Sequence, residues 1–224
     1  MDSNIISAVL ISLKVATIST LITGVLGIIF ARFRAYKSKR VSSFMDTAIS
    51  ILMVLPPSLV GYILLRLIGN NGPIGRILLR LGSEGIVFSW VACVIASSVV
   101  SFPIMYQNAK GAFLSIDERV INAARTMGAS EFKIFRRITL PLAQTELISG
   151  IILAFARGLG EFGATMMVAG NIVGKTQTIS LALYYAVERG DTRTANILML
   201  VVIGISFALI YTLNKWIEKK KERC

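Results

Sequence analysis

Long apolar runs separated by short polar segments dominate the pattern of this chain. Four stretches of 17 to 25 residues carry no charge at all: Val15–Ala31, Thr47–Leu65, Gly85–Ala109 and Thr194–Asn214. A helix of about 20 apolar residues crosses the hydrocarbon core of a bilayer. A fifth candidate, roughly Leu142–Ala169, is interrupted by charge. The pattern therefore predicts an all-α integral membrane protein with about five transmembrane helices, forming a single membrane domain over residues 1–224.

Two apolar segments depart from a simple spanning helix. The second span contains Leu55-Pro56-Pro57 near its middle. Proline removes a backbone donor and clashes with the preceding turn, so we expect the helix to kink or break there. The break could serve packing or line a pathway, and the sequence leaves both open. Thr176–Val187 is too short to cross, which predicts a helix at the outer face or dipping partly into the protein.

Composition and charge placement support a membrane protein. Hydrophobic residues make up 54% of the chain and charged residues only 16%, against about a quarter in soluble domains. If the chain alternates across the membrane, sixteen basic residues fall on one side and six on the other. This positive-inside bias predicts an outside N-terminus and a cytoplasmic C-terminus. The net charge of +12 thus reflects topology and membrane lipid, and we expect no nucleic-acid partner.

Residues suited to chemistry are scarce. The chain has no histidine, and its two cysteines, Cys93 and Cys224, define no metal site or disulfide framework. Residues 158–163 match G-x-G-x-x-G, but no predicted strand precedes them. Residues 170–176 resemble a phosphate-binding loop, but Gly170 stands one residue too close to Gly174-Lys175-Thr176. We therefore expect no catalytic residue, no metal and no cofactor in this chain.

A polar, basic segment over residues 117–141 separates the third and fourth spans. Its apolar residues Val120, Ile121, Ala123 and Ala124 lie among charges, as is typical of a short helix that packs one face into a partner groove. Gly128 is expected to end this helix with a positive φ.

The spacing within this segment is specific. Asn122-Ala123-Ala124 is followed after three residues by Gly128, and after nine more by Ile138-Thr139-Leu140-Pro141. This resembles the "EAA" cytoplasmic loop of bacterial and archaeal ABC-importer permeases, in which Glu-Ala-Ala, glycine and Ile-x-Leu-Pro stand at the same intervals. Asn122 occupies the position where the family usually carries Glu. The resemblance implies that an ATPase subunit couples to this loop through Asn122, Ala123, Ala124, Gly128, Ile138, Leu140 and Pro141.

The fourth span carries an unusual pair of charges. Arg157 and Glu161 are four residues apart, which predicts that they share a helix face and pair. Intramembrane charges are costly and face protein or a watery cavity. A structural ion pair and a place beside a permeation path both stay open. Small residues spaced by four predict close helix packing, in two sets: Gly150, Ala154, Gly158; and Ala156, Gly160, Ala164.

Residues 55–62, 156–165, 168–172 and 174–178 resemble molybdate ABC permeases more than their sulfate relatives. The resemblance implies a homodimeric permease in the cytoplasmic membrane of a prokaryote, with ABC ATPase subunits that use ATP and Mg and an extracytoplasmic oxyanion-binding protein. It implies alternating access, and tungstate or sulfate stay open as cargo. The translocation-path candidates are Pro56, Pro57, Ser58, Arg157, Glu161, Gly163 and Thr165.

Two other classes of function remain as alternatives. A membrane enzyme would need chemical groups in its external loops, and Lys175–Arg193 offers only scattered Glu188, Asp191 and basic residues. A membrane anchor or assembly protein without transport would not need the long cytoplasmic loop or the proline-broken second span.

Overall fold

The computed structural model describes residues 3–35, 39–82 and 85–221, and every regular element within these ranges is helical. In chain order the helices are α1 Ser3–Ala35, α2 Lys39–Val54, α3 Pro57–Ile68, α4 Pro73–Arg80, α5 Trp90–Leu114, α6 Glu118–Thr126, α7 Glu131–Ile134, the π-helix η1 Phe135–Thr139, α8 Leu140–Leu142, α9 Gln144–Leu159, α10 Gly163–Ala169, α11 Ile179–Glu188 and α12 Thr192–Lys221. The prediction of an all-α protein is confirmed.

Three helices are long and apolar enough to cross a membrane unaided. They are α1, α5 and α12, of 33, 25 and 30 residues. At 1.5 Å of rise per residue each exceeds a hydrocarbon core of about 30 Å. α1 and α12 contain the charge-free stretches Val15–Ala31 and Thr194–Asn214, whereas α5 begins at Trp90, five residues after the start of the stretch Gly85–Ala109.

The other two candidate spans are bent helix pairs. Val41–Val54 and Pro57–Arg80 meet at an angle of 111°, and Glu131–Leu142 and Gln144–Leu159 meet at 71°. The second pair is shifted from the predicted span over Leu142–Ala169, because the helix breaks after Leu159. Counted as one span each, these pairs bring the total to five. The first bend lies at Leu55-Pro56, where the helix was expected to kink or break, because neither Pro56 nor Pro57 can donate a backbone hydrogen bond.

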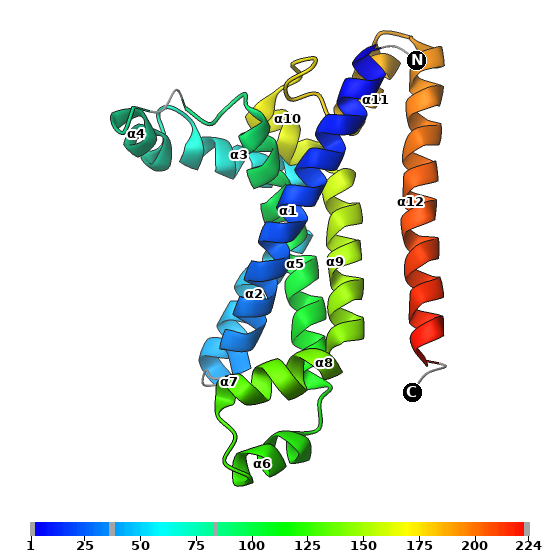
Figure 1. Cartoon of the computed structure of the whole chain (residues 1–224). Coiled ribbons are helices and arrows are strands. Elements are labelled where there is room, and N and C mark those ends of the chain that lie inside the picture. The colour runs from blue at the N-terminus through cyan, green and yellow to red at the C-terminus, as the bar shows by residue number, and fades with distance from the viewer. Residues whose placement is uncertain (1–2, 36–38, 83–84, 222–224) are drawn as a thin grey trace.

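The core of the bundle is formed by α1, α5 and α9, which lie side by side (Figure 1). Close approach depends on small residues. A Cβ atom added to Gly150 would lie 2.7 Å from Cβ of Asn108, and one added to Gly158 would lie 2.8 Å from Oγ of Ser97. The first predicted set of small residues thus packs as expected. The second does not, since Gly160 is exposed at the end of α9.

The two ends of the bundle differ. Figure 1 places the beginning of α1, together with α4 and α11, at one end and α6 and α7 at the other. Helix α11 corresponds to the short helix predicted over 176–187 and packs inward, with Ile179, Leu181, Ala182 and Ala186 buried. Helix α12 stands off the bundle, and only 11% of its most apolar stretch is buried.

Candidate functional site

The polar segment between α5 and α9 folds into a defined unit at one end of the bundle (Figure 1). The side chain of Asp117 accepts a hydrogen bond from the Arg119 N–H at 2.8 Å and so caps the start of α6. Gly128 has a φ of +78°. The Ala129 N–H reaches back to the Ala124 carbonyl at 3.1 Å, a closure that needs a left-handed residue at Gly128. The predicted helix end at Gly128 is confirmed.

The motif residues of this segment do not share one surface. Asn122 and Ala123 are exposed, whereas Ala124 is 8% exposed and faces its own segment. Sequence reasoning missed Met127 and Phe132, which are 86% and 72% exposed. Large apolar residues beside Gly128 in an otherwise polar segment were the available signal. Together with half-exposed Val120, they offer an apolar surface to a partner.

A groove of about 360 Å³ runs between α6 and the helices that follow it. Its lining includes three of the predicted motif residues, Ala124, Gly128 and Ile138. The full lining is Ala124, Met127, Gly128, Ala129, Lys133, Ile134, Arg137 and Ile138. Two cations thus stand beside an apolar floor. The arrangement suits a protein partner that brings apolar and acidic side chains.

Ion pairs tie this segment to the bundle. Asn122 accepts a hydrogen bond from Arg125 at 3.0 Å, and Arg125 pairs with Glu131 at 2.6 Å. Glu131 in turn lies 3.6 Å from the Arg32 guanidinium at the end of α1. Arg32 also lies over the Phe135 ring, 4.6 Å from its centroid. Asn122, which replaces the Glu of the resembled motif, therefore takes part in a chain of polar contacts from α6 to α1.

The segment returns to the bundle through a five-residue π-helix, η1. Such wide turns are rare and concentrate at functional sites. Pro141, which has no N–H to donate, follows in α8 and is exposed, whereas Ile138 and Leu140 are half-buried. The Thr139 side chain is buried at 3% exposure, and its hydroxyl has no hydrogen-bond partner among the described residues.

The path candidates gather where two helix breaks meet. The first break lies between α2 and α3, and the second, at residues 160–162, lies between α9 and α10. A Cβ atom added to Gly163 would lie 3.1 Å from the Ser58 nitrogen and 3.2 Å from Cβ of Pro57. One added to Gly61 would lie 2.7 Å from Cα of Ala164. The structure therefore brings Pro57, Ser58 and Gly163 together.

Arg157 and Glu161 form the expected pair, with 2.7 Å between Nη1 and Oε2. They do not share a helix, however, because α9 ends at Leu159 and Glu161 lies in the break. Oε1 of Glu161 accepts a hydrogen bond from the Ala164 N–H at 2.8 Å and so caps α10. Glycine at positions 158 and 160 lowers the stability of the helix here, and the prediction of a continuous helix did not take this into account.

Exposure separates the remaining path candidates. Pro56 and Ser58 are exposed in the single chain, and the Arg157 side chain is 30% exposed. Glu161 and Thr165 are buried, at 2% and 1%. Of the two hydroxyl candidates, Ser58 and Thr165, only Ser58 therefore reaches an open surface.

The two glycine patterns belong to helix ends and loops of the bundle. Residues 158–163 cover the end of α9 and the break after it. In the loop over residues 170–176, the Thr176 hydroxyl donates to the Gly170 carbonyl at 3.3 Å and accepts from the Ile172 N–H at 3.0 Å. Thr176 is fully buried, so its hydroxyl is used within its own loop.

Known proteins are similar in sequence to this chain over nearly its whole length. Molybdenum transport system permease protein ModB of Haemophilus influenzae is 37% identical over 97% of this chain and 95% of its own length. ModB of Escherichia coli K12 is 38% identical over 95% of this chain and 93% of its own. Sulfate transport system permease protein CysT of Salmonella typhimurium is 27% identical over 95% of this chain and 76% of its own.

Solved structures share the fold. An inward-facing structure of the MetNI methionine ABC transporter has a TM-score of 0.76 at 16% identity, covering 98% of this chain and 99% of that one. A bacterial alginate ABC transporter in complex with a pentasaccharide-bound periplasmic protein has a TM-score of 0.77 at 15% identity, covering 96% and 78%.

Residues 24–223 match the family described as "Binding-protein-dependent transport system inner membrane component". The match covers most of the chain, and the long apolar helices of the structure are those expected of an inner-membrane component. The chain therefore belongs to this family, as a multi-pass inner-membrane permease of an ABC importer.

Proposed function

We propose that this permease carries molybdate across the cytoplasmic membrane of a prokaryote, as a homodimer. The proposal rests on the sequence identity of 37–38% to molybdenum transport permeases over nearly the full length of both chains, compared with 27% to a sulfate permease. Tungstate, a tetrahedral dianion of the same shape, is a second cargo that the same site would accept.

Two partners follow from this proposal. An extracytoplasmic binding protein delivers the oxyanion, and a separate ATPase subunit hydrolyses ATP with Mg. The ATPase docks on the coupling segment, by which we mean residues 117–141. Exposed Met127 and Phe132 beside the groove with Lys133 and Arg137 support this assignment, because interfaces favour apolar anchors flanked by charges.

The orientation proposed is an outside N-terminus and a cytoplasmic C-terminus. The coupling segment lies at the end of the bundle where α12 finishes, opposite the start of α1, which supports that orientation (Figure 1). It agrees with the excess of basic residues on the side of the coupling segment.

The path itself is proposed to run past the two helix breaks. Backbone groups at helix breaks can bind a substrate ion. Because Pro57 has no N–H and Glu161 accepts from the Ala164 N–H, the backbone donors proposed here are those of Ser58 and Gly163. Ser58 adds an exposed hydroxyl at the start of α3. Arg157 adds positive potential, which the carboxylate of Glu161 reduces because it lies 2.7 Å away. Such a path binds weakly, which favours release.

Uptake by the complete transporter tests the cargo. We expect vesicles that contain permease, ATPase and binding protein to accumulate molybdate only with ATP and binding protein, with tungstate competing well and sulfate poorly. Sulfate competing as strongly as tungstate would overturn the assignment. The purified permease alone should show no tight molybdate binding, and submicromolar affinity there would contradict a weakly binding path.

A further inference from the structure

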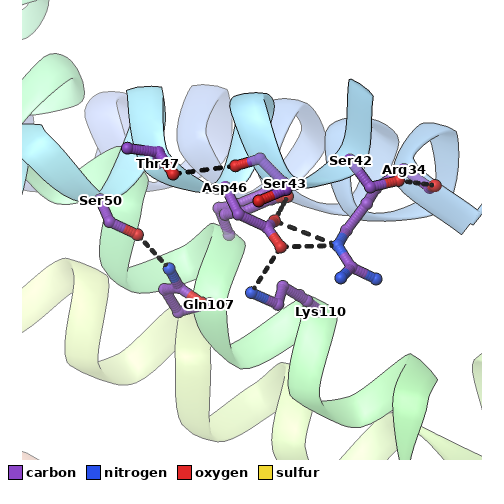
Figure 2. Close-up of polar contacts among 9 residues, drawn as sticks. Arg34, Ser42, Ser43, Asp46, Thr47, Ser50, Gln107 and Lys110 are labelled. Atoms are coloured by element: carbon purple, nitrogen blue, oxygen red, sulfur yellow. Dashed lines mark hydrogen bonds and ion pairs between the residues drawn. The ribbon is translucent and has the colours of Figure 1, made fainter. Parts of the chain in front are cut away.

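Asp46 lies in the middle of α2, and its carboxylate is bound by three donors from two other helices. Nε of Arg34 in α1 lies 3.1 Å from Oδ1 and 3.0 Å from Oδ2. Nζ of Lys110 in α5 lies 3.0 Å from Oδ2, and the Tyr106 hydroxyl, also in α5, donates to Oδ1. Figure 2 shows Arg34 and Lys110 converging on the carboxylate from the two neighbouring helices. Asp46 thereby links α1, α2 and α5.

Little else holds α2 in place. Of its side chains described between residues 41 and 54, only Ser42 and Ile49 are buried. Phe44 and Val54 are 75% and 81% exposed. Inside a bilayer, an apolar side chain gains no hydrophobic free energy by exchanging lipid for another helix. Polar contacts and close packing therefore determine the position of a helix. Within the single chain, the position of α2 therefore depends mainly on its polar contacts with α1 and α5.

Weaker polar contacts accompany the Asp46 cluster. Nε2 of Gln107 in α5 donates to Oγ of Ser50 at 2.7 Å, one turn further along α2. The Ser42 hydroxyl donates to the Arg34 carbonyl at 3.1 Å. Both are neutral hydrogen bonds, which are about half as strong as charge-assisted ones. Asp46 is thus the strongest tie between α2 and the bundle among the contacts described.

The coupling segment adjoins this cluster. A cavity of about 780 Å³ has Arg34 and Asp46 on one side and Asn122, Arg125 and Thr139 of the coupling segment on the other. The chain of polar contacts from Asn122 through Arg125 and Glu131 ends at Arg32, two residues before Arg34. A displacement of α6 therefore reaches the end of α1 and, through Arg34, the carboxylate of Asp46.

The far end of α2 leads to the path. After the 111° bend, α3 packs against α10, where Pro57, Ser58 and Gly163 meet. We propose that Asp46 is a positioning residue for coupled transport, which makes α2 follow α1 and α5 when the ATPase moves the coupling segment, and so transmits that motion to the helix breaks. This rests on the proposed docking of an ATPase on the coupling segment.

The test uses the complete transporter in vesicles and the ratio of molybdate taken up to ATP hydrolysed. Asp46→Asn keeps the shape but removes the charge. We expect it to reach the membrane, assemble and hydrolyse ATP, with the ratio lowered about tenfold, within the usual range of coupling between distant sites. Asp46→Glu should keep the ratio near that of the unmodified protein. Thr47→Val is the control, because among the described residues the Thr47 hydroxyl donates only to the Ser43 carbonyl within α2, at 2.9 Å.

An unchanged ratio in Asp46→Asn overturns the proposal, as does an equal loss in Thr47→Val. If Asp46→Asn fails to reach the membrane, Lys110→Gln and Tyr106→Phe each remove one donor. Normal ratios in both of these variants would then overturn it.

A second measurement does not depend on the cargo. Spin labels at Arg119 of α6 and Tyr62 of α3 report whether the path helix moves with the coupling segment, and both positions are exposed. We expect ATP to displace both labels relative to α5 in the unmodified transporter, and only the Arg119 label in Asp46→Asn. Joint movement in that variant refutes the role of Asp46. Failure of molybdate uptake in the unmodified transporter would refute the proposed cargo alone.

Discussion

The Arg157–Glu161 pair allows its structural and functional roles to be separated by mutation. Glu161 is 2% exposed and Arg157 30%, and the two are 2.7 Å apart. Removing one member of a buried pair strands the other, at a cost of about 3–5 kcal/mol. Because Arg157 reaches solvent, screening lowers the loss, and we expect about 3 kcal/mol for Arg157→Met.

The second variant must respect the cap on α10. Glu161→Leu would remove both the charge and the acceptor for the Ala164 N–H, adding about 1 kcal/mol for the lost cap. Glu161→Gln keeps that acceptor. Since Arg157 stays partly in solvent, Glu161→Gln alone should cost only about 1 kcal/mol. If the pair is structural, the double variant Arg157→Met with Glu161→Gln should recover most of the stability that Arg157→Met loses.

Membrane abundance, thermal unfolding of the purified permease and molybdate uptake by the complete transporter would be measured for the three variants. A structural role predicts that abundance, unfolding temperature and uptake recover together in the double variant. A double variant that folds normally, supports ATP hydrolysis and yet transports no molybdate would refute that role, and would assign Arg157 to the anion. A double variant no more stable than Arg157→Met would refute the energetic coupling of the two side chains.

Three further predictions concern single positions. Gly128→Val should uncouple ATP hydrolysis from the loaded binding protein, while the permease still reaches the membrane. The φ of Gly128 is +78°, so the added side chain is strained even though no atom lies within 4 Å. Unchanged stimulation of ATP hydrolysis by the binding protein would count against the coupling segment. Asn122→Glu should assemble normally, since a carboxylate there can pair with Arg125, now 3.0 Å from the Asn122 oxygen; pull-down of the ATPase would detect a failure. Gly61→Ala should destabilise the permease by about 1–3 kcal/mol through overpacking against Ala164, 2.7 Å from the added atom. The matched control, Gly204→Ala in α12, meets nothing within 4 Å and should be neutral or stabilising in thermal unfolding.

Charge-free length was enough to locate four of the five spans, because few sequences other than membrane helices hold 17 or more residues without charge. The span predicted over Leu142–Ala169 contains charges and was placed less well. Proline chemistry placed the break at Leu55-Pro56 for the same local reason. The break at residues 160–162 escaped prediction, since glycine is tolerated in membrane helices and only tertiary contacts decide whether it bends. The spacing of Arg157 and Glu161 predicted their contact but misplaced Glu161 on a helix.

The candidate site was likewise predicted only in part from the sequence. The motif spacing located the coupling segment, whereas the inward orientation of Ala124 depends on how α6 packs against α7. Asp46 was missed because it lies immediately before the charge-free stretch that begins at Thr47. A lone carboxylate beside a predicted span was the signal, since such groups are rare without a partner. Its partners, Arg34 and Lys110, could not be read from the sequence, because they come from two other helices.

The π-helix η1 constrains how this chain can change length during evolution. A π turn holds one residue more than the surrounding helix needs, so deleting any one of residues 135–139 would let the segment close as an ordinary α-helix. The wide turn absorbs its extra residue locally, so this deletion would leave α6 and α7 at nearly the same angle to α9. Removing one residue from α9 itself would instead rotate the helix on one side of the deletion by about 100° relative to the other side. Single deletions should therefore be tolerated within residues 135–139 better than within α9.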